Sequence, residues 1–421
     1  MSYHILDERS VADYLRALPA VMDRFSKGAE LDAKEVGDGN LNLVFIVSNR
    51  FSPAEKVVVK QAVPYLRIAG EGWPLSRHRM RFESQALLLH NRLVPGLAPA
   101  VFYVDDEMSV VVMEWLGRHE ILRKRLIARE VFPHLGDHLS TFLAETLFRT
   151  SDCYLSAAEK KSLQSAYINT ELCKITEDFV FTNPYMTSPE NRWNHEIDAQ
   201  AKDLRANKHL KLAILEMKEL FMCNSQALVH GDLHTGSIMV NQEQTRVLDP
   251  EFAFLGPMGF DVGAVLANLA TSYCSHFVHT ADAGERNAYQ EYLIRTMKGV
   301  WEGFAMKFEA LWSTNNTGSL CPDPYWQFPS GSQAFAEFRF RYLRAVLRDT
   351  AGMGGCKMMR RVLGIAHVAE FESIADPVRR AQPERMALRV GSRWVQERES
   401  FKGVDDLIGV LLEETSSPTQ G

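Results

Sequence analysis

Three carboxylates on two short segments have the residue types and spacing that phosphoryl transfer needs. Asp232 lies in the polar run at residues 230–237, and Asp249 and Glu251 flank Pro250 further along the chain. Apolar, β-rich runs around a polar turn separate the segments and predict a hairpin that returns the chain toward Asp232. Transfer of a phosphoryl group from ATP requires a base for the attacking hydroxyl and oxygen ligands for Mg²⁺, and these acids supply both.

The three acids are predicted to divide this chemistry between them. Asp232 precedes the hairpin, where it can face an incoming hydroxyl and accept its proton. Asp249 and Glu251 are two positions apart, so in extended geometry their side chains would share a face and repel unless a cation lay between them. We therefore expect Asp249, Pro250 and Glu251 to bind Mg²⁺ and ATP. Each acid alone could be a turn residue, so the prediction depends on their combination.

Two histidines four positions apart, His230 and His234, raise the alternative of a zinc site. The zinc-binding His-Glu-x-x-His pattern needs a glutamate after the first histidine and a helix between the two. Here Gly231 and Asp232 follow His230, and Gly231 disfavours a helix. We therefore expect no zinc, and we interpret His230 as a packed histidine that supports the loop.

The elements that would position these groups begin with a small twisted sheet. Its strands are expected at residues 31–37, 41–47 and 56–60. Gly37, Gly39 and Asn40 fall between the first two strands, where a glycine-rich backbone can approach phosphates closely and bind them through N–H groups. Most such loops are ordinary hairpin turns, so the prediction of a phosphate-binding loop depends on the two strands that follow it, the second of which ends in a lysine.

Lys60 is the expected phosphate-binding lysine of that sheet. It follows three consecutive valines, so its stem is expected to be buried and its ammonium to require a partner. An amphipathic helix is predicted at residues 80–93, with Glu83 near its start. Glu83 is therefore the expected ion-pair partner of Lys60, although an acid in a first helical turn is also favourable without any partner.

Arginines are dense near the end of the chain, and two of them are candidates for binding a substrate. Arg360 and Arg361 follow a glycine-rich stretch at residues 351–355 that is expected to bend the chain at a site. Guanidinium groups suit sugar hydroxyls and developing phosphate charge. Arg348 is a secondary candidate, and the other arginines are expected to be surface or ion-pairing residues.

Composition places the chain among globular proteins and excludes several functional classes. It has 421 residues, 46% of them hydrophobic and 24% charged, with a net charge of −6. The negative charge disfavours nonspecific nucleic-acid binding, and no apolar run reaches membrane-spanning length. The first residues predict no signal peptide, and six scattered cysteines without a Cys-x-x-Cys pair suit reduced thiols. We therefore expect a cytoplasmic protein with no nucleic-acid or membrane partner.

The motifs resemble the protein-kinase-like fold, in its aminoglycoside phosphotransferase and choline kinase branch. Within that branch, His-Gly-Asp-Leu-His-Thr-Gly-Ser-Ile-Met at residues 230–239, with Asp-Pro-Glu at 249–251, is similar to the 5-methylthioribose kinase family. The resemblance extends over residues 7–376. It implies phosphorylation of the 1-hydroxyl of S-methyl-5-thioribose by ATP in methionine salvage, with Mg²⁺ as cofactor and a homodimer as the assembly.

The resemblance also implies an α+β, bilobal architecture. A small β-rich N-lobe would span residues 1–113, a hinge residues 114–117, and a larger, mainly helical C-lobe residues 118–421. The hinge would bind adenine through backbone groups of the residues that follow the strand at 110–113. The expected adenine-binding residues are Met113, Glu114, Trp115 and Leu116.

The resemblance also implies roles for individual residues. Trp73 resembles the tryptophan of a lid over the substrate, Arg360 and Arg361 resemble a substrate-binding arginine pair, and Asp261 is expected to hold the catalytic loop from beneath. From the residues alone, Asp261 is expected near a helix start, where it could cap the helix. Ser237 departs from the broad kinase pattern, which usually has a metal-binding asparagine there, so Glu251 is expected to take that role.

Two alternatives remain open at this point. A related small-molecule kinase could act on choline, an aminoglycoside or homoserine, although paired arginines disfavour a cationic acceptor. A pseudokinase that only binds ligands is a second alternative, which the presence of the lysine, the base and the metal acids disfavours. Measurement of ADP release with a panel of acceptors would separate these alternatives.

Overall fold

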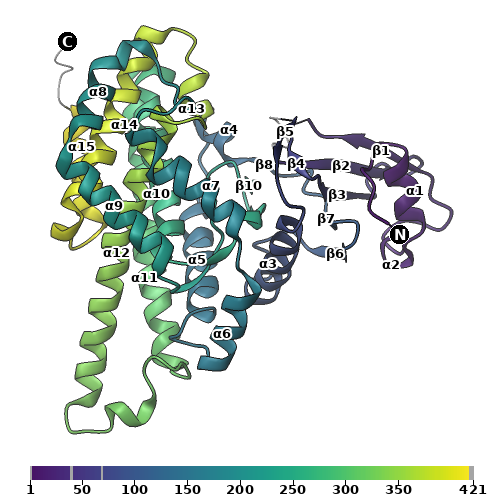
Figure 1. Cartoon of the computed structure of the whole chain (residues 1–421), viewed down its shortest axis with the longest axis horizontal. Coiled ribbons are helices and arrows are strands. Elements are labelled where there is room, and N and C mark those ends of the chain that lie inside the picture. Colours follow the sequence, from purple (N-terminus) through teal and green to yellow (C-terminus); the bar gives the residue numbers. More distant parts are fainter. Residues whose placement is uncertain (1, 38–40, 68–69, 417–421) are drawn as a thin grey trace.

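The computed structural model describes residues 2–37, 41–67 and 70–416. The fold is α+β: a sheet formed by the first part of the chain stands beside a much larger assembly of helices (Figure 1). The α+β class predicted from the sequence is therefore confirmed. The division at residues 1–113, 114–117 and 118–421 stays a prediction.

The amino-terminal sheet is antiparallel and has five strands in the order β1-β2-β3-β7-β6. The strands are β1 (Leu31–Glu35), β2 (Asn42–Asn49), β3 (Lys56–Ala62), β6 (Val101–Asp105) and β7 (Val110–Glu114). One face packs against α1 (Ser10–Arg16) and α2 (Pro19–Met22), and the other against α3 (Arg79–Leu93).

The alternation of side chains along β3 determines where the buried lysine points. Val57 and Val59 belong to the apolar cluster on the side of α1 and α2. Because side chains two positions apart share a face of a strand, Val58 and Lys60 face α3 instead. Lys60 is thereby directed at Glu83 on that helix.

A short hairpin connects the sheet to α3 and carries Trp73. It consists of β4 (Tyr65–Leu66) and β5 (Gly70–Pro74), which pair antiparallel with a shifted register. In Figure 1 this hairpin lies on the side of the sheet that faces the helices.

The hairpin predicted between the acidic segments is present. β10 (Ile238–Val240) pairs antiparallel with β11 (Thr245–Val247), and β8 (Glu120–Ile121) adds a third strand. A second pair joins β9 (Ala227–Val229) to β12 (Phe254–Gly256). The loop with Asp232 therefore lies between β9 and β10, and Asp249 follows β11.

The remaining elements are helices. The α-helices are α4 (Leu122–Ile127), α5 (Leu135–Arg149), α6 (Ala157–Ala166), α7 (Thr170–Phe181), α8 (Asp198–Ala206), α9 (Lys208–Cys223), α10 (Met258–His279), α11 (Ala283–Thr314), α12 (Gly331–Leu363), α13 (Ala369–Glu372), α14 (Pro377–Glu397) and α15 (Val404–Ser416). The 3-10 helices are η1 (Asn183–Tyr185), η2 (His195–Ile197), η3 (Pro250–Phe252), η4 (Asp323–Trp326) and η5 (Arg398–Ser400). Within the described ranges, no helix has the length and apolar character needed to cross a membrane.

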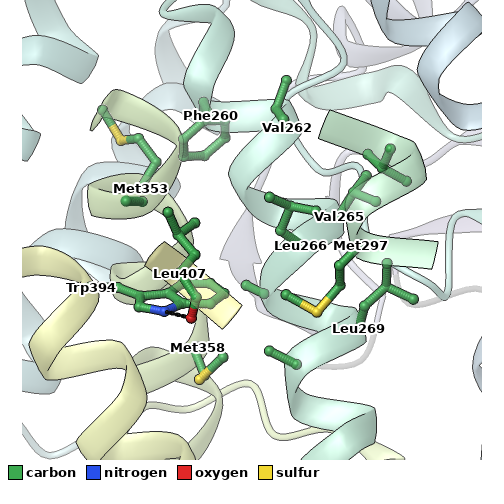
Figure 2. Close-up of a cluster of buried hydrophobic side chains, with 14 of the residues drawn as sticks. Phe260, Val262, Val265, Leu266, Leu269, Met297, Met353, Met358, Trp394 and Leu407 are labelled. Atoms are coloured by element: carbon green, nitrogen blue, oxygen red, sulfur yellow. Dashed lines mark hydrogen bonds between the residues drawn. The ribbon is translucent and has the colours of Figure 1, made fainter. Parts of the chain in front are cut away.

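Helix α10 forms the centre of the helical core. Its side chains are buried on all sides, as expected for a helix that is apolar around its whole circumference. Figure 2 shows Phe260 and Leu266 of α10 packed among Met353 of α12 and other apolar side chains. The Nε1–H of Trp394 donates a hydrogen bond of 3.0 Å to the carbonyl oxygen of Leu407, which joins α14 to α15.

The expected bend at residues 351–355 is absent, because α12 continues through these glycines without interruption. They are instead the point at which α12 crosses α10. A Cβ on Gly354 would lie 2.9 Å from the carbonyl oxygen of Gly263, so close packing of the two helices requires glycine here. The glycines place the end of α12 against the loop with Asp232.

Candidate active site

The loop before β10 is held by a buried acid. Asp261 accepts hydrogen bonds from the backbone N–H groups of His230, at 2.6 Å, and Gly231, at 3.1 Å. Burial raises the pKa of Asp261, and these hydrogen bonds oppose that rise. The capping prediction was wrong: α10 begins at Met258, and no side chain caps it.

Gly231 is required by its conformation and by its surroundings. Its φ of 82° is in the left-handed region that favours glycine. A Cβ at this position would also lie 2.2 Å from the carbonyl oxygen of Phe252. The loop therefore passes directly over η3, and this contact brings Asp232 toward the segment that contains Asp249 and Glu251.

The two histidines of the loop are both held by backbone groups. His230 donates from Nε2 to the carbonyl oxygen of Leu248 at 2.8 Å and accepts at Nδ1 from the N–H of Asp232 at 3.2 Å. His234 accepts at Nδ1 from the N–H groups of Gly236, at 2.9 Å, and Ser237, at 3.1 Å. Because Nδ1 of His234 is an acceptor, its proton resides on Nε2.

This tautomer makes His234 a neutral donor to the proposed base. Its Nε2 lies 3.3 Å from Oδ2 of Asp232. Burial lowers the pKa of His234 to about 4, although Asp232 opposes this effect. At neutral pH His234 therefore orients Asp232 through a hydrogen bond without carrying a charge.

Two cations of α12 lie at the other carboxylate oxygen of Asp232. Lys357 Nζ is 3.3 Å from Oδ1, and Arg360 Nη2 is 3.8 Å from the same atom. Burial would raise the pKa of Asp232, but His234, Lys357 and Arg361 outweigh it and hold the pKa well below its usual value. Asp232 is therefore ionised, as a proton acceptor must be.

On the sheet side, a buried lysine joins two acids. Lys60 Nζ lies 2.7 Å from Oε1 of Glu83 and 2.8 Å from Oδ1 of Asp249. Burial would lower the pKa of Lys60, but Asp249 and Glu83 hold the pKa above its usual value. The structure thus contains the Lys60–Glu83 ion pair that the sequence predicted, and adds Asp249 to it.

Asp249 and Glu251 do not share the face of a strand, which corrects the sequence-based expectation. Asp249 has a φ of 61°, and η3 follows it, so the segment is not extended. The side chain of Asp249 remains 39% exposed. Glu251 is buried, accepts a 2.8 Å hydrogen bond from Asn42 Nδ2 and lies 3.8 Å from Nε of Arg79.

The two acids fit a magnesium ion carried by a nucleotide better than a resident metal site. No cluster of three or more His, Cys, Asp or Glu side chains suited to a metal occurs among the described residues. Mg²⁺ usually takes one or two carboxylates and completes its coordination with phosphates and water. Asp249 and Glu251 have the oxygen donors for that arrangement, and Asp249 is open to solvent.

The residues expected at the nucleotide include the end of β1 and the end of β7. Gly37 follows β1, whereas Gly39 and Asn40 fall outside the described residues. Met113 packs between the sheet and α3. The backbone N–H of Glu114 donates to the carbonyl oxygen of Ala100 at 2.8 Å, and the N–H of Ala100 donates to Oε2 of Glu114 at 3.1 Å.

The chain leaves the sheet after Glu114, and the next two residues, Trp115 and Leu116, are apolar. The ammonium of Lys56 lies over the Trp115 ring, 4.3 Å from its centroid. Leu116 is buried. Their assignment to adenine stays a prediction.

Of the three arginines expected at the substrate, two lie at the site and one does not. Arg360 faces Asp232, and Arg361 donates to the carbonyl oxygen of Ala366 at 3.2 Å. Arg348 instead pairs with Glu399 at 3.0 Å. It precedes Arg360 by 12 residues (360 − 348) on a continuous helix, which corresponds to about 18 Å.

Trp73 reaches across to the helical part of the molecule. Its ring centroid lies 6.1 Å from that of Phe179 on α7. The neighbouring backbone N–H of Ser76 donates to Glu171 Oε2 at 2.7 Å, also on α7. The hairpin that carries Trp73 therefore rests on α7.

Known proteins with similar sequences are phosphotransferases. The model of the phosphotransferase enzyme family matches residues 32–304. Methylthioribose kinase 1 from Oryza sativa subsp. japonica is 42% identical over 96% of this chain and 94% of its own length. Methylthioribose kinase from Bacillus pumilus is 36% identical over 97% of each chain. Among solved structures, choline kinase from Cryptosporidium parvum aligns at 11% identity with a TM-score of 0.44, over 97% of this chain and 99% of that one.

Proposed function

The chain belongs to the methylthioribose kinase family of phosphotransferase enzymes, and on that premise we propose that it phosphorylates the 1-hydroxyl of S-methyl-5-thioribose with ATP in methionine salvage. The product would be S-methyl-5-thioribose 1-phosphate. The observation that carries this proposal is the position of Asp232, ionised between a neutral histidine and the cations of α12. A carboxylate in that setting suits an uncharged, hydroxyl-bearing acceptor whose product is an anion.

ATP would bind between the sheet and the helices. The residues proposed to contact it are Gly37, Gly39, Asn40, Lys60, Met113, Glu114, Trp115, Leu116, Asp249, Pro250 and Glu251. Lys60 would bind phosphate oxygens while Glu83 keeps its ammonium in place. Mg²⁺, held by Asp249 and Glu251, would neutralise the charge on the phosphates.

Asp232 would orient the 1-hydroxyl and receive its proton. A lone pair of the hydroxyl oxygen forms the new bond to the γ-phosphorus, and the bond to the β,γ-bridging oxygen breaks with its electron pair leaving on ADP. Asp261 and His230 support this step by holding the loop, and His234 orients the carboxylate. Positioning of this kind contributes most of the catalysis in phosphoryl transfer.

The acceptor would lie between α12 and the hairpin of Trp73. Arg360 and Arg361 would bind the sugar and developing negative charge. Trp73, which already rests on α7, would cover the thiomethyl end and exclude water. We do not assign Arg348 to this site.

The substrate is tested by an acceptor panel. With MgATP, we expect ADP release with S-methyl-5-thioribose and none above background with choline, an aminoglycoside or homoserine. The ³¹P NMR spectrum should show a phosphorus coupled to the anomeric proton. Turnover of choline or homoserine in place of the sugar would contradict the proposed substrate, and ATP binding without any turnover would favour the pseudokinase.

We also propose that the protein acts in the cytoplasm as a homodimer, as the family resemblance implies. All six cysteines are free thiols, which suits a reducing compartment. Met306 on α11 and Phe340 on α12 are each 64% exposed, and such apolar side chains are candidates for a contact between subunits.

A further inference from the structure

Three cations of one helix gather around a single carboxylate at the active site. Lys357, Arg360 and Arg361 lie three and four positions apart, so they occupy one side of α12. Lys357 and Arg360 both approach Oδ1 of Asp232. Asp232 and Asp261 are the two carboxylates that face these three cations, so an excess of positive charge remains buried and calls for an anion.

A buried donor without a partner supports this reading. Arg360 is 8% exposed, and within the described part of the chain its Nε has no hydrogen-bond partner. Nearby, Arg123 is already paired with Glu370 at 3.2 Å. The α12 cations are therefore not balanced by protein groups alone.

We propose that Lys357 is a further catalytic residue whose ammonium binds the phosphoryl group as it passes from ATP to the acceptor, and then binds the phosphate of the product. This inference rests on the proposed function. The acceptor hydroxyl must come within about 2.6–3.2 Å of Asp232 to transfer its proton. Lys357 Nζ is 3.3 Å from that carboxylate, so the ammonium is adjacent to the oxygen that receives phosphorus.

The catalytic loop does not supply this cation itself. His234 is the loop residue that contacts the carboxylate of Asp232, and its Nδ1 accepts two backbone N–H groups, so it stays neutral. Lys357 is held from below by the ring of Phe260, at 4.2 Å from the ammonium. A cation fixed over an aromatic ring is positioned before the substrate arrives, which favours stabilisation of a transient charge.

Lys357 would remain protonated throughout the reaction. The hydroxyl proton passes to Asp232, and the bond between the γ-phosphorus and ADP breaks as the bond to the acceptor forms. Lys357 would contact the equatorial oxygens of the phosphoryl group in transfer, which carry negative charge. Because that charge persists on the product, the same contact stabilises the sugar phosphate.

The test compares Lys357→Met with Lys357→Arg, and uses Lys211→Met, at an exposed position on α9, as the control. We expect Lys357→Met to lower kcat by roughly 10²–10³-fold, with unchanged KM for ATP and the sugar. Calorimetry should show binding of the sugar 1-phosphate weakened roughly 10–100-fold and binding of the free sugar unchanged. Lys357→Arg should restore part of both losses. Loss of one partner of a buried ion pair is destabilising, but His234 and Arg360 remain beside Asp232, so we expect the melting temperature to fall only modestly.

The pH profile provides a second readout. Burial lowers the pKa of Lys357 to about 8, and Asp232 opposes that effect. The charged groups facing it are Asp232, Asp261, Arg360 and Arg361. The two carboxylates stay ionised at alkaline pH, whereas burial lowers the pKa of both arginines below its usual value. Since the ammonium is lost as pH rises through its pKa, kcat/KM of the wild type should decline above about pH 8. Lys357→Arg should remove that decline.

Two results would overturn the proposal. One is a Lys357→Met variant with wild-type kcat. The other is a slow variant that binds the sugar 1-phosphate as tightly as the wild type does, because Lys357 would then act only by holding Asp232. Failure of the wild type to phosphorylate the sugar would instead contradict the proposed substrate. The same variants would then be compared with whichever acceptor of the panel supports ADP release.

Discussion

Replacing Asp232 with asparagine is expected to lower kcat by roughly 10²–10⁴-fold, the usual contribution of a general base. Asparagine keeps the shape of the side chain but cannot accept the proton of the acceptor hydroxyl. The affinity for MgATP should stay at the wild-type value, because Lys60 and Asp249 belong to the other wall of the site. Steady-state kinetics with varied ATP and varied acceptor separates the two effects.

Two further variants make this result specific. Asp232→Glu retains the negative charge beside Lys357 but displaces the carboxylate, so it should fold normally and still lose about 10²-fold in kcat. Asp203→Asn removes an exposed acid on α8 and should be fully active. If Asp232→Asn retained near-wild-type turnover, Asp232 would not be the base.

Replacing Asp249 with asparagine is expected to weaken binding of MgATP, with a smaller effect on the sugar. Loss of one hydrogen bond or ligand contact to a charged group corresponds to roughly 10–100-fold in affinity. Asparagine is the appropriate replacement because Asp249 has a φ of 61°, a conformation that asparagine tolerates better than alanine does. The KM for ATP should be measured across a series of Mg²⁺ concentrations.

The matched control is Asp106→Asn, at an exposed turn between β6 and β7. It should leave the magnesium dependence unaltered. An Asp249→Asn enzyme with the same magnesium dependence as the wild type would exclude Asp249 as a ligand.

The sequence predicted much of the site because its motifs are local. The hairpin of β10 and β11 follows from two β-rich runs and a polar turn, so the proximity of Asp232 to the later acids could be inferred. The alternation along β3 likewise directs Lys60 to the helix with Glu83. These inferences needed only period-two geometry and short connections.

Other features depend on packing between distant segments, which spacing does not reveal. Glycines at residues 351–355 indicated a bend, but α12 continues through them as one helix, and Gly354 packs against Gly263 of α10 at the crossing. Arg348 looked close to Arg360 in sequence, yet a continuous helix places the two far apart. Asp249 and Glu251 fail to share a face because of the left-handed residue and η3.

Lys357 was missed, although the sequence contained a signal. It is the one charged residue among the apolar and small residues at 351–359, three positions before Arg360. A lone charge in an apolar helical run is expected to have a buried partner. The neutral state of His234 had no such signal, since it depends on backbone N–H groups that only the folded loop brings to Nδ1.

Diffraction from crystals grown with Mn²⁺, a non-hydrolysable ATP analogue and S-methyl-5-thioribose tests the central claim most directly. We predict an anomalous manganese peak bound by Asp249 and Glu251 at the terminal phosphate, with the 1-hydroxyl of the sugar hydrogen-bonded to Asp232. Manganese bound at other side chains, or a sugar whose 1-hydroxyl points away from Asp232, would contradict the account.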